Sequence, residues 1–208
     1  MSKIGIMGGT FNPIHTGHLI LAEIARSQCE LDKVIFIPSG CPAYKDSGVI
    51  LPSDIRLAMV SQAIKDNEYF EISDIEIQRK GNTYTVDTLE YIKGKYPGDN
   101  IFFIMGADSI NTIYEWYEYE KIFPLCTIIA ALRGGNDNKL ALDNVDKLKS
   151  HYGASIQVVN MPVMDISSTQ IRWNFIHEKS IRYCVPDSVF RFLNENKDVI
   201  SERWNKVE

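Results

Sequence analysis

Two histidines follow a glycine-rich turn near the start of the chain, in the stretch GGTFNPIHTGH at positions 8–18. His15 and His18 are three positions apart at the start of an expected helix, so both rings can face one side and donate hydrogen bonds to phosphate oxygens. Gly8 and Gly9 let a ligand approach the backbone closely, and the N–H groups of a helix start favour an anion. The stretch therefore predicts a phosphate site.

Simpler interpretations of these residues stay open. A Gly-Gly pair is commonly only a turn, and two histidines at this spacing also suit an exposed surface or half of a metal site. The standard phosphate motifs do not explain the stretch, because no G-K-[ST] follows and Gly5, Gly8 and Gly9 do not form a G-x-G-x-x-G pattern. A zinc protease would need Glu after the first histidine, where this chain has Thr16.

A second candidate phosphate contact lies toward the other end of the chain, in the sequence ISSTQIR at positions 166–172. Hydroxyl side chains at a helix start accompany N–H groups that have no partner inside the helix, and Arg172 follows one turn later on the same side. Arginine binds phosphate strongly through paired hydrogen bonds. A Ser-Ser-Thr run is also a common helix cap, so the motif alone is a weak signal.

Apolar runs alternate with helical patterns along the chain. Strands are predicted at positions 4–7, 34–37, 101–105, 126–132 and 155–159. This βαβ pattern favours a mostly parallel sheet with helices on both faces, in which ligands collect at the carboxyl ends of the strands. We therefore expect a single α/β domain over residues 1–208, with a small C-terminal helical part. Positions 69–77 are predicted as extended chain with a break.

Two further candidates follow predicted strands. Lys45 lies in a loop rich in proline and glycine at positions 38–52, and it is either an ordinary solvated lysine or a phosphate contact. Asp108 comes just after the strand at positions 101–105. Its carboxylate would either accept hydrogen bonds from ribose hydroxyls or cap the next helix.

Two aromatic segments could contact a ligand or simply pack. Tyr84 and Thr85 begin a predicted helix whose first N–H groups could hold a carboxylate, and Thr83 or Thr85 is the expected N-cap. Trp116 belongs to an aromatic stripe at positions 113–123, which either joins the core or stacks on a heterocycle.

Composition narrows the functional class. The net charge of −5 argues against a nucleic-acid partner, whose binding normally depends on clustered Lys and Arg. The four cysteines form no C-x-x-C pair and are expected to be reduced thiols. No apolar run reaches the roughly 18 residues of a membrane span. We therefore expect a cytoplasmic protein without a membrane partner, and a homo-oligomer is compatible with the sequence.

Taken together, GGTFNPIHTGH and ISSTQIR make the chain similar to bacterial nicotinate-nucleotide adenylyltransferases, members of the nucleotidyltransferase superfamily with its T/H-x-G-H signature. The similarity runs nearly end to end and includes the segments IPSGCPAYK, NTYTVDTL, FFIMGADSI, WYEYEKI and VPDSVFRFL. It implies a Rossmann-like nucleotidyltransferase fold and Mg²⁺ dependence. It also implies transfer of AMP from ATP to nicotinate mononucleotide, which gives nicotinate adenine dinucleotide and pyrophosphate in NAD biosynthesis.

The resemblance also implies roles for individual residues. Three would be catalytic: His15, His18 and Arg172. Nine would bind ATP: Gly8, Gly9, Thr10, Phe11, Lys45, Gly106, Asp108, Ile166 and Ser168. Three would bind the mononucleotide: Tyr84, Thr85 and Trp116. Mg²⁺ would be held mainly by phosphate oxygens and water, without a metal-binding set of side chains.

This chain departs from the family pattern at two places. Asn12 stands where the family usually has Asp, and Tyr44 replaces His in a loop that usually reads P-P-H-K. Three alternatives therefore stay open. The acceptor could be nicotinamide mononucleotide, alone or in addition, or the chain could be a catalytically impaired nucleotide-binding module. A cytidylyl- or pantetheine-phosphate adenylyltransferase fits the NTYTVDTL and WYEYEKI segments poorly.

Overall fold

The computed structural model describes residues 1–42, 48–133 and 138–205. The chain divides into two compact units, each assembled from three stretches of sequence. Unit 1 comprises Met1–Gly8, Leu21–Ile35 and Tyr84–Met164, and unit 2 comprises Gly9–Ile20, Phe36–Thr83 and Asp165–Glu208. The single domain over residues 1–208 stays a prediction. Lys45 and Tyr44 lie outside the described residues.

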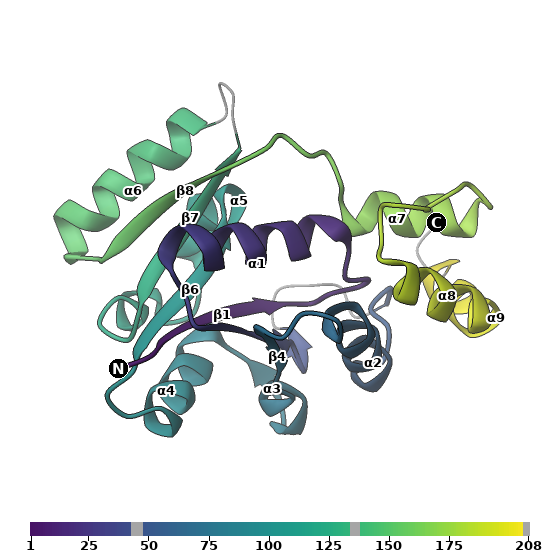
Figure 1. Cartoon of the computed structure of the whole chain (residues 1–208), viewed down its shortest axis with the longest axis horizontal. Coiled ribbons are helices and arrows are strands. Elements are labelled where there is room, and N and C mark those ends of the chain that lie inside the picture. The colour runs from purple at the N-terminus through teal and green to yellow at the C-terminus, as the bar shows by residue number, and fades with distance from the viewer. Residues whose placement is uncertain (43–47, 134–137, 206–208) are drawn as a thin grey trace. The chain divides into compact units, whose positions relative to one another are not determined.

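The predicted α/β fold with a mostly parallel sheet is confirmed (Figure 1). A six-stranded sheet has the order β4-β2-β1-β6-β7-β8. Its strands are β1 (Lys3–Gly9), β2 (Lys33–Pro38), β4 (Phe70–Ile72), β6 (Asn100–Gly106), β7 (Thr127–Arg133) and β8 (Ile156–Met161). A separate parallel pair joins β3 (Cys41–Pro42) and β5 (Asn82–Thr83).

Most helices lie between these strands along the chain, and those at the C-terminal end follow β8. They are α1 (Thr16–Cys29), α2 (Ser53–Ile64), α3 (Ile75–Gln78), α4 (Thr85–Lys95), α5 (Ala107–Thr112), α6 (Asn138–Tyr152), α7 (Ser168–Ile176), α8 (Asp187–Glu195) and α9 (Lys197–Trp204). Two short 3₁₀ helices, η1 (Ile113–Glu115) and η2 (Tyr119–Ile122), lie between α5 and β7.

The core of unit 1 forms around β1, β6 and β7, which pair in parallel. Every residue at positions 101–105 is buried, because helices cover both faces of these central strands. Gly5 pairs with Phe102 and Ile6 with Phe103, so β1 and β6 end at the same edge of the sheet. Gly8 and Gly106 therefore lie at that edge, where the sequence places the candidate ligand site.

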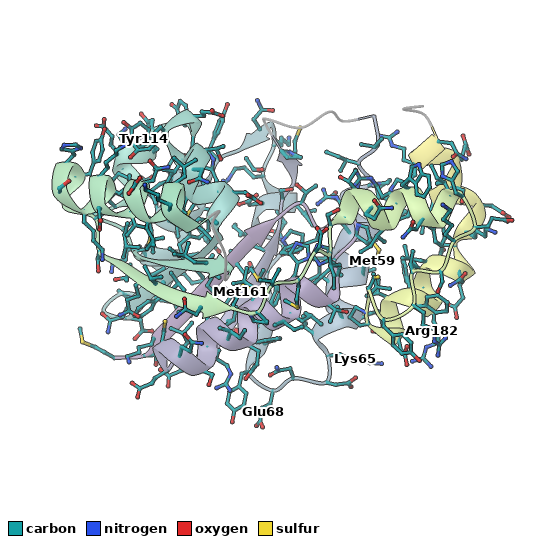
Figure 2. All side chains as sticks on the ribbon, turned by 90° about the horizontal axis from the view of Figure 1, so that it is seen from above. Met59, Lys65, Glu68, Tyr114, Met161 and Arg182 are labelled. Carbon is teal, nitrogen blue, oxygen red and sulfur yellow. The ribbon has the colours of Figure 1, made fainter. Side chains whose placement is uncertain are left out.

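The core of unit 2 includes α2 and the C-terminal helices, and Figure 1 shows α7, α8 and α9 gathered together. Met59 of α2, labelled in Figure 2, is fully buried, and so are Val189 and Leu193 of α8. The Ser188 hydroxyl of α8 donates a hydrogen bond to the Gln62 carbonyl of α2 at 2.8 Å. The predicted C-terminal helical part is present, and it includes α9, which the sequence did not predict.

Some local predictions are wrong. Positions 69–77 contain the short strand β4 and then α3. The alternation of apolar and polar residues predicted extended chain throughout, but Glu76, one of its polar positions, is buried in α3. The N-cap of α4 is Tyr84, whose side chain makes no capping hydrogen bond, and neither Thr83 nor Thr85 takes that position. In the part of the chain that the structure describes, no helix has the length and apolar character needed to cross a membrane.

Candidate active site

The two histidines of the glycine-rich stretch form a compact pair in unit 2. Their rings stack with centroids 3.7 Å apart and planes inclined by 29°. The backbone N–H of His15 donates to Nδ1 of His18 at 3.2 Å. Since Nδ1 accepts this bond, a neutral His18 ring carries its proton on Nε2. His15 is only 8% exposed, so its ring is held by its surroundings.

Close packing explains the glycine between these histidines. A Cβ atom at Gly17 would lie 3.1 Å from Cε1 and Nδ1 of His15, tighter than an ordinary van der Waals contact. Any side chain at this position would therefore press on the His15 ring. Gly17 serves close packing here, and the same Cβ would also reach Ile166 at 4.0 Å.

Phe11 supports the other histidine. Its backbone has a positive φ of 49°, which few residues other than glycine adopt. The ring meets His18 edge-on, with centroids 5.1 Å apart, and it also covers Gly9, where an added Cβ would lie 3.0 Å from the ring. Thr10 and Phe11 are both buried, so in this structure they support the loop from its buried side.

The C-terminal part of unit 2 fixes the start of α1. The Thr16 N–H donates to the carbonyl of Cys184 at 2.9 Å. The Thr16 hydroxyl donates to the carbonyl of Tyr183 at 3.0 Å. These bonds hold the residue between His15 and Gly17 and thereby set the direction in which the helix leaves the loop. No pattern in the sequence indicated this connection.

The structure brings the second motif onto the same loop. The Ser168 hydroxyl donates to the Pro13 carbonyl at 2.9 Å, and Nη1 of Arg172 donates to the Asn12 carbonyl, also at 2.9 Å. Nη2 of Arg172 donates to the Thr169 hydroxyl at 3.1 Å. Burial lowers the pKa of the Arg172 guanidinium, which still remains charged because arginine does not deprotonate in proteins. A fixed positive charge therefore lies beside the loop that carries the histidines.

The helix cap of this motif is a neighbouring residue. The Ser167 hydroxyl accepts a hydrogen bond from the Gln170 N–H at 3.2 Å. Because Ser167 provides the cap, Ser168 is available to bind Pro13. The capping interpretation of this motif is thus confirmed for Ser167, and the phosphate contact of Ser168 stays a prediction.

The remaining predicted residues belong to unit 1. Trp116 meets Phe103 edge-on at 6.3 Å between centroids, and a Cβ at Gly8 would contact the same Phe103 ring at 3.7 Å. Tyr84 lies against Tyr117, with centroids 4.4 Å apart. This second aromatic contact was not predicted, because Tyr84 and Tyr117 lie in separate segments of the sequence, NTYTVDTL and WYEYEKI.

Gly106 and Asp108 lie where β6 ends and α5 begins. Gly106 is the N-cap of α5, and a Cβ there would meet no atom of the described residues within 4 Å. Asp108 is exposed in the first turn of α5. An N-cap role for Asp108 is excluded because Gly106 takes that position, so its carboxylate remains available at the end of the strand.

Asn12 links the glycine-rich loop to a distant segment. Its side-chain N–H donates to the Val49 carbonyl at 2.9 Å, and its side-chain oxygen accepts from the Leu51 N–H at 3.1 Å. The residue is 5% exposed. A carboxylate could accept the second bond but could not donate the first. The departure from the family pattern at this position therefore has a structural use in this chain.

Asn12→Ala is expected to lower the free energy of unfolding by about 1–3 kcal/mol, since it leaves the half-buried Val49 carbonyl and the buried Leu51 N–H without this partner. Asn12→Asp is also expected to be less stable than the unchanged protein, because a carboxylate loses the hydrogen bond to the Val49 carbonyl and keeps only the one from the Leu51 N–H. Urea unfolding measures both. Asn194→Ala, which removes an exposed bond within α8, is the control and should change stability by less than about 0.5 kcal/mol. Equal losses at positions 12 and 194 would contradict this role.

Comparison with known proteins identifies the family to which this chain belongs. A model of the cytidylyltransferase-like family matches residues 6–174, which include both phosphate motifs. The fold and the site thus define a nucleotidyltransferase.

Individual relatives are more specific. A protein of Desulfitobacterium hafniense named "probable nicotinate-nucleotide adenylyltransferase" is 42% identical over 93% of each chain. One of Lachnoclostridium phytofermentans with the same name is 40% identical over 93% of this chain and 96% of its own. The chain belongs to the nicotinate-nucleotide adenylyltransferase family.

A solved structure supports the fold. The nicotinic acid mononucleotide adenylyltransferase of Plasmodium falciparum, complexed with NaAD, superposes with a TM-score of 0.80 at 20% identity and covers 98% of both chains. At that identity the likeness concerns the fold alone, and it confirms the Rossmann-like nucleotidyltransferase architecture.

Proposed function

We propose that this chain transfers the AMP group of ATP to nicotinate mononucleotide, releasing pyrophosphate and forming nicotinate adenine dinucleotide in NAD biosynthesis. The names of its relatives support this activity. The observation that carries the proposal is the cluster in unit 2, where Arg172 binds the carbonyl of Asn12, three residues before the stacked pair His15 and His18.

The reaction needs charge stabilisation more than proton transfer. A phosphate oxygen of the mononucleotide attacks the α-phosphorus of ATP, and the bond from that phosphorus to pyrophosphate breaks. Because the nucleophile is already an anion, no general base is required, and catalysis depends on alignment and on donors that meet the developing charge. The donors would be Nε2–H of His18, the His15 ring and the guanidinium of Arg172. Ser168, Gly9 and Thr10 would line the phosphates.

The side chains of the loop suit Mg²⁺ only as an ion bound to the substrate, not as one that they ligate themselves. The described side chains that would meet the phosphates are hydrogen-bond donors and cations, and among the described residues no group of three or more His, Cys, Asp or Glu could hold a metal ion. We propose that Mg²⁺ is held mainly by phosphate oxygens and water. When bound there, it neutralises charge on the phosphates.

Unit 1 would bind the two ends of the product. Asp108 would accept hydrogen bonds from ribose hydroxyls, and Gly106 leaves room for adenosine beside it. Trp116 would stack on the pyridine ring. The first N–H groups of α4, near Tyr84 and Thr85, would receive the nicotinate carboxylate, because a helix N-terminus favours an anion.

The thiols support a reducing compartment, and we propose the cytoplasm. Cys29, Cys41, Cys126 and Cys184 are all free. Burial raises the pKa of the Cys126 thiol to about 12, so it stays protonated and inert. Free cysteines are usual where glutathione and thioredoxin keep thiols reduced. We also propose that nucleic acid is not a substrate, because the chain carries a net charge of −5.

With Mg·ATP, kcat/KM for nicotinate mononucleotide is expected to exceed that for nicotinamide mononucleotide by roughly 10- to 150-fold, since a hydrogen bond to a charged group contributes about 1.5–3 kcal/mol. Pyrophosphate release measures both substrates. A preference for the amide would overturn the assigned acceptor. An absence of release with either acceptor would instead support a nucleotide-binding module without catalysis.

A further inference from the structure

Arg56 is the largest of the fully buried side chains, with 1% of its surface exposed. It lies in α2 on the same helical face as Met59 and Val60, both of which are fully buried. Burial lowers the pKa of its guanidinium, and the nearby carboxylates of Glu76 and Asp54 partly oppose that shift. Placing a cation in such surroundings is costly, so its hydrogen bonds must compensate.

Four hydrogen bonds from this guanidinium end on main-chain carbonyl oxygens. Nε donates to Leu51 at 3.0 Å and Nη1 to Thr10 at 2.8 Å. Nη2 donates to Ser39 at 2.6 Å and to Gly40 at 3.1 Å. These carbonyls come from three separate segments: the glycine-rich loop, the end of β2 and the residues before α2. One planar side chain therefore fixes three segments relative to one another.

The bond to Thr10 bears directly on the phosphate site. In a planar trans peptide the C=O and the following N–H point in opposite directions. With the Thr10 carbonyl held by Arg56, the N–H of Phe11 points away from the guanidinium. Phe11 has a positive φ, and its ring both covers Gly9 and meets the edge of His18. The orientation of the Thr10 peptide thus influences the position of His18.

A second contact supports the same loop. The Ser39 N–H donates to the Gly9 carbonyl at 2.8 Å, while the Ser39 carbonyl accepts from Arg56. Gly9 and Thr10 are consecutive, so both carbonyls of this part of the loop are bound, one through Ser39 and one directly. Without the guanidinium, the carbonyls of Thr10, Ser39, Gly40 and Leu51 would lose this donor together, while the Gly9 carbonyl would keep the Ser39 N–H.

We propose that Arg56 is a positioning residue for the phosphate site. By holding the carbonyls of Thr10 and Ser39, it keeps the loop in the conformation that aims its N–H groups and His18 at the nucleotide phosphates. The inference rests on the proposed adenylyl transfer. Lysine cannot replace Arg56 in this role, because an ammonium group lacks the planar set of five donors that reaches all of these carbonyls.

The first test compares Arg56→Lys with Ser188→Ala, which removes a hydrogen bond between α8 and α2 without contact to the loop. Both are assayed for pyrophosphate release at a temperature at which circular dichroism shows each variant fully folded. Arg56→Lys is expected to lower kcat by roughly 10- to 100-fold with little change in KM for ATP, because misplaced donors fail the transition state more than the ground state. Ser188→Ala should keep both parameters. A folded Arg56→Lys protein with unchanged kcat would overturn the proposal.

The second test needs no substrate. Hydrogen–deuterium exchange of the protein without ligand is expected to be at least roughly fivefold faster at residues 10–14 in Arg56→Lys, and unchanged there in Ser188→Ala. Unchanged exchange in Arg56→Lys would overturn the positioning role. If the unchanged protein released no pyrophosphate with nicotinate mononucleotide, the proposed function would fail, while the exchange result would still decide whether Arg56 orders the loop.

Discussion

His18→Ala is expected to lower kcat for adenylyl transfer by about 10²–10³-fold, equivalent to about 2.7–4 kcal/mol in the barrier. The proposed reason is the orientation of the ring: Nδ1 of His18 accepts the backbone N–H of His15, so a neutral ring would present Nε2–H to the phosphates without reorganisation. The measurement is steady-state pyrophosphate release with saturating Mg·ATP and nicotinate mononucleotide. KM for ATP should change much less than kcat, because charge develops mainly in the transition state.

The matched control is His151→Ala. His151 is exposed on α6 in unit 1 and has no part in the proposed site. Its removal should leave kcat unchanged. Near-normal turnover in His18→Ala, or equal losses in both variants, would remove the case for His18 as a charge donor.

Gly40→Ala is expected to destabilise the protein by about 3 kcal/mol or more. A Cβ at this position would lie 2.1 Å from the carbonyl oxygen of Glu76 and 2.8 Å from its carbonyl carbon. Both are backbone atoms of α3, so a side chain cannot swing away to relieve the overlap. The loss should appear as a lower midpoint in urea unfolding followed by circular dichroism. Activity should fall as well, since the Gly40 carbonyl accepts from Arg56.

Gly94→Ala provides the opposite control within the same chain. Gly94 is exposed inside α4, and an added Cβ there would meet no atom of the described residues within 4 Å. Since alanine favours a helix by up to about 1 kcal/mol over glycine, this variant should be slightly more stable. A Gly40→Ala protein as stable as Gly94→Ala would show that α3 does not pack against residue 40 in solution.

Sequence patterns predicted the features that depend on local composition. The apolar runs that became β1, β6 and β7 needed no knowledge of their partners, because strands covered on both faces are apolar throughout. The sequence also linked the two phosphate motifs, and the structure places them together through Ser168 and Arg172. The roles of these residues in catalysis stay predictions.

The features that escaped prediction depend on contacts between distant segments. Asn12 binds a segment 37 to 39 positions away, and no periodicity reveals such a pair. The sequence does contain one indication that Arg56 is buried, because Arg56 shares the face of α2 that carries Met59 and Val60. A charged residue on the apolar face of a helix indicates a buried network.

The hydrogen bonds of the glycine-rich loop also constrain when the chain can complete its fold. Thr16 is held by Tyr183 and Cys184, and the carbonyls of Asn12 and Pro13 are held from α7. A ribosome makes the loop before these partners. The loop of the proposed phosphate site, although encoded by residues 8–18, therefore acquires its final geometry only after α7 and Cys184 have been made, and a growing chain that stops before residue 168 has the signature histidines without the supports that hold their loop.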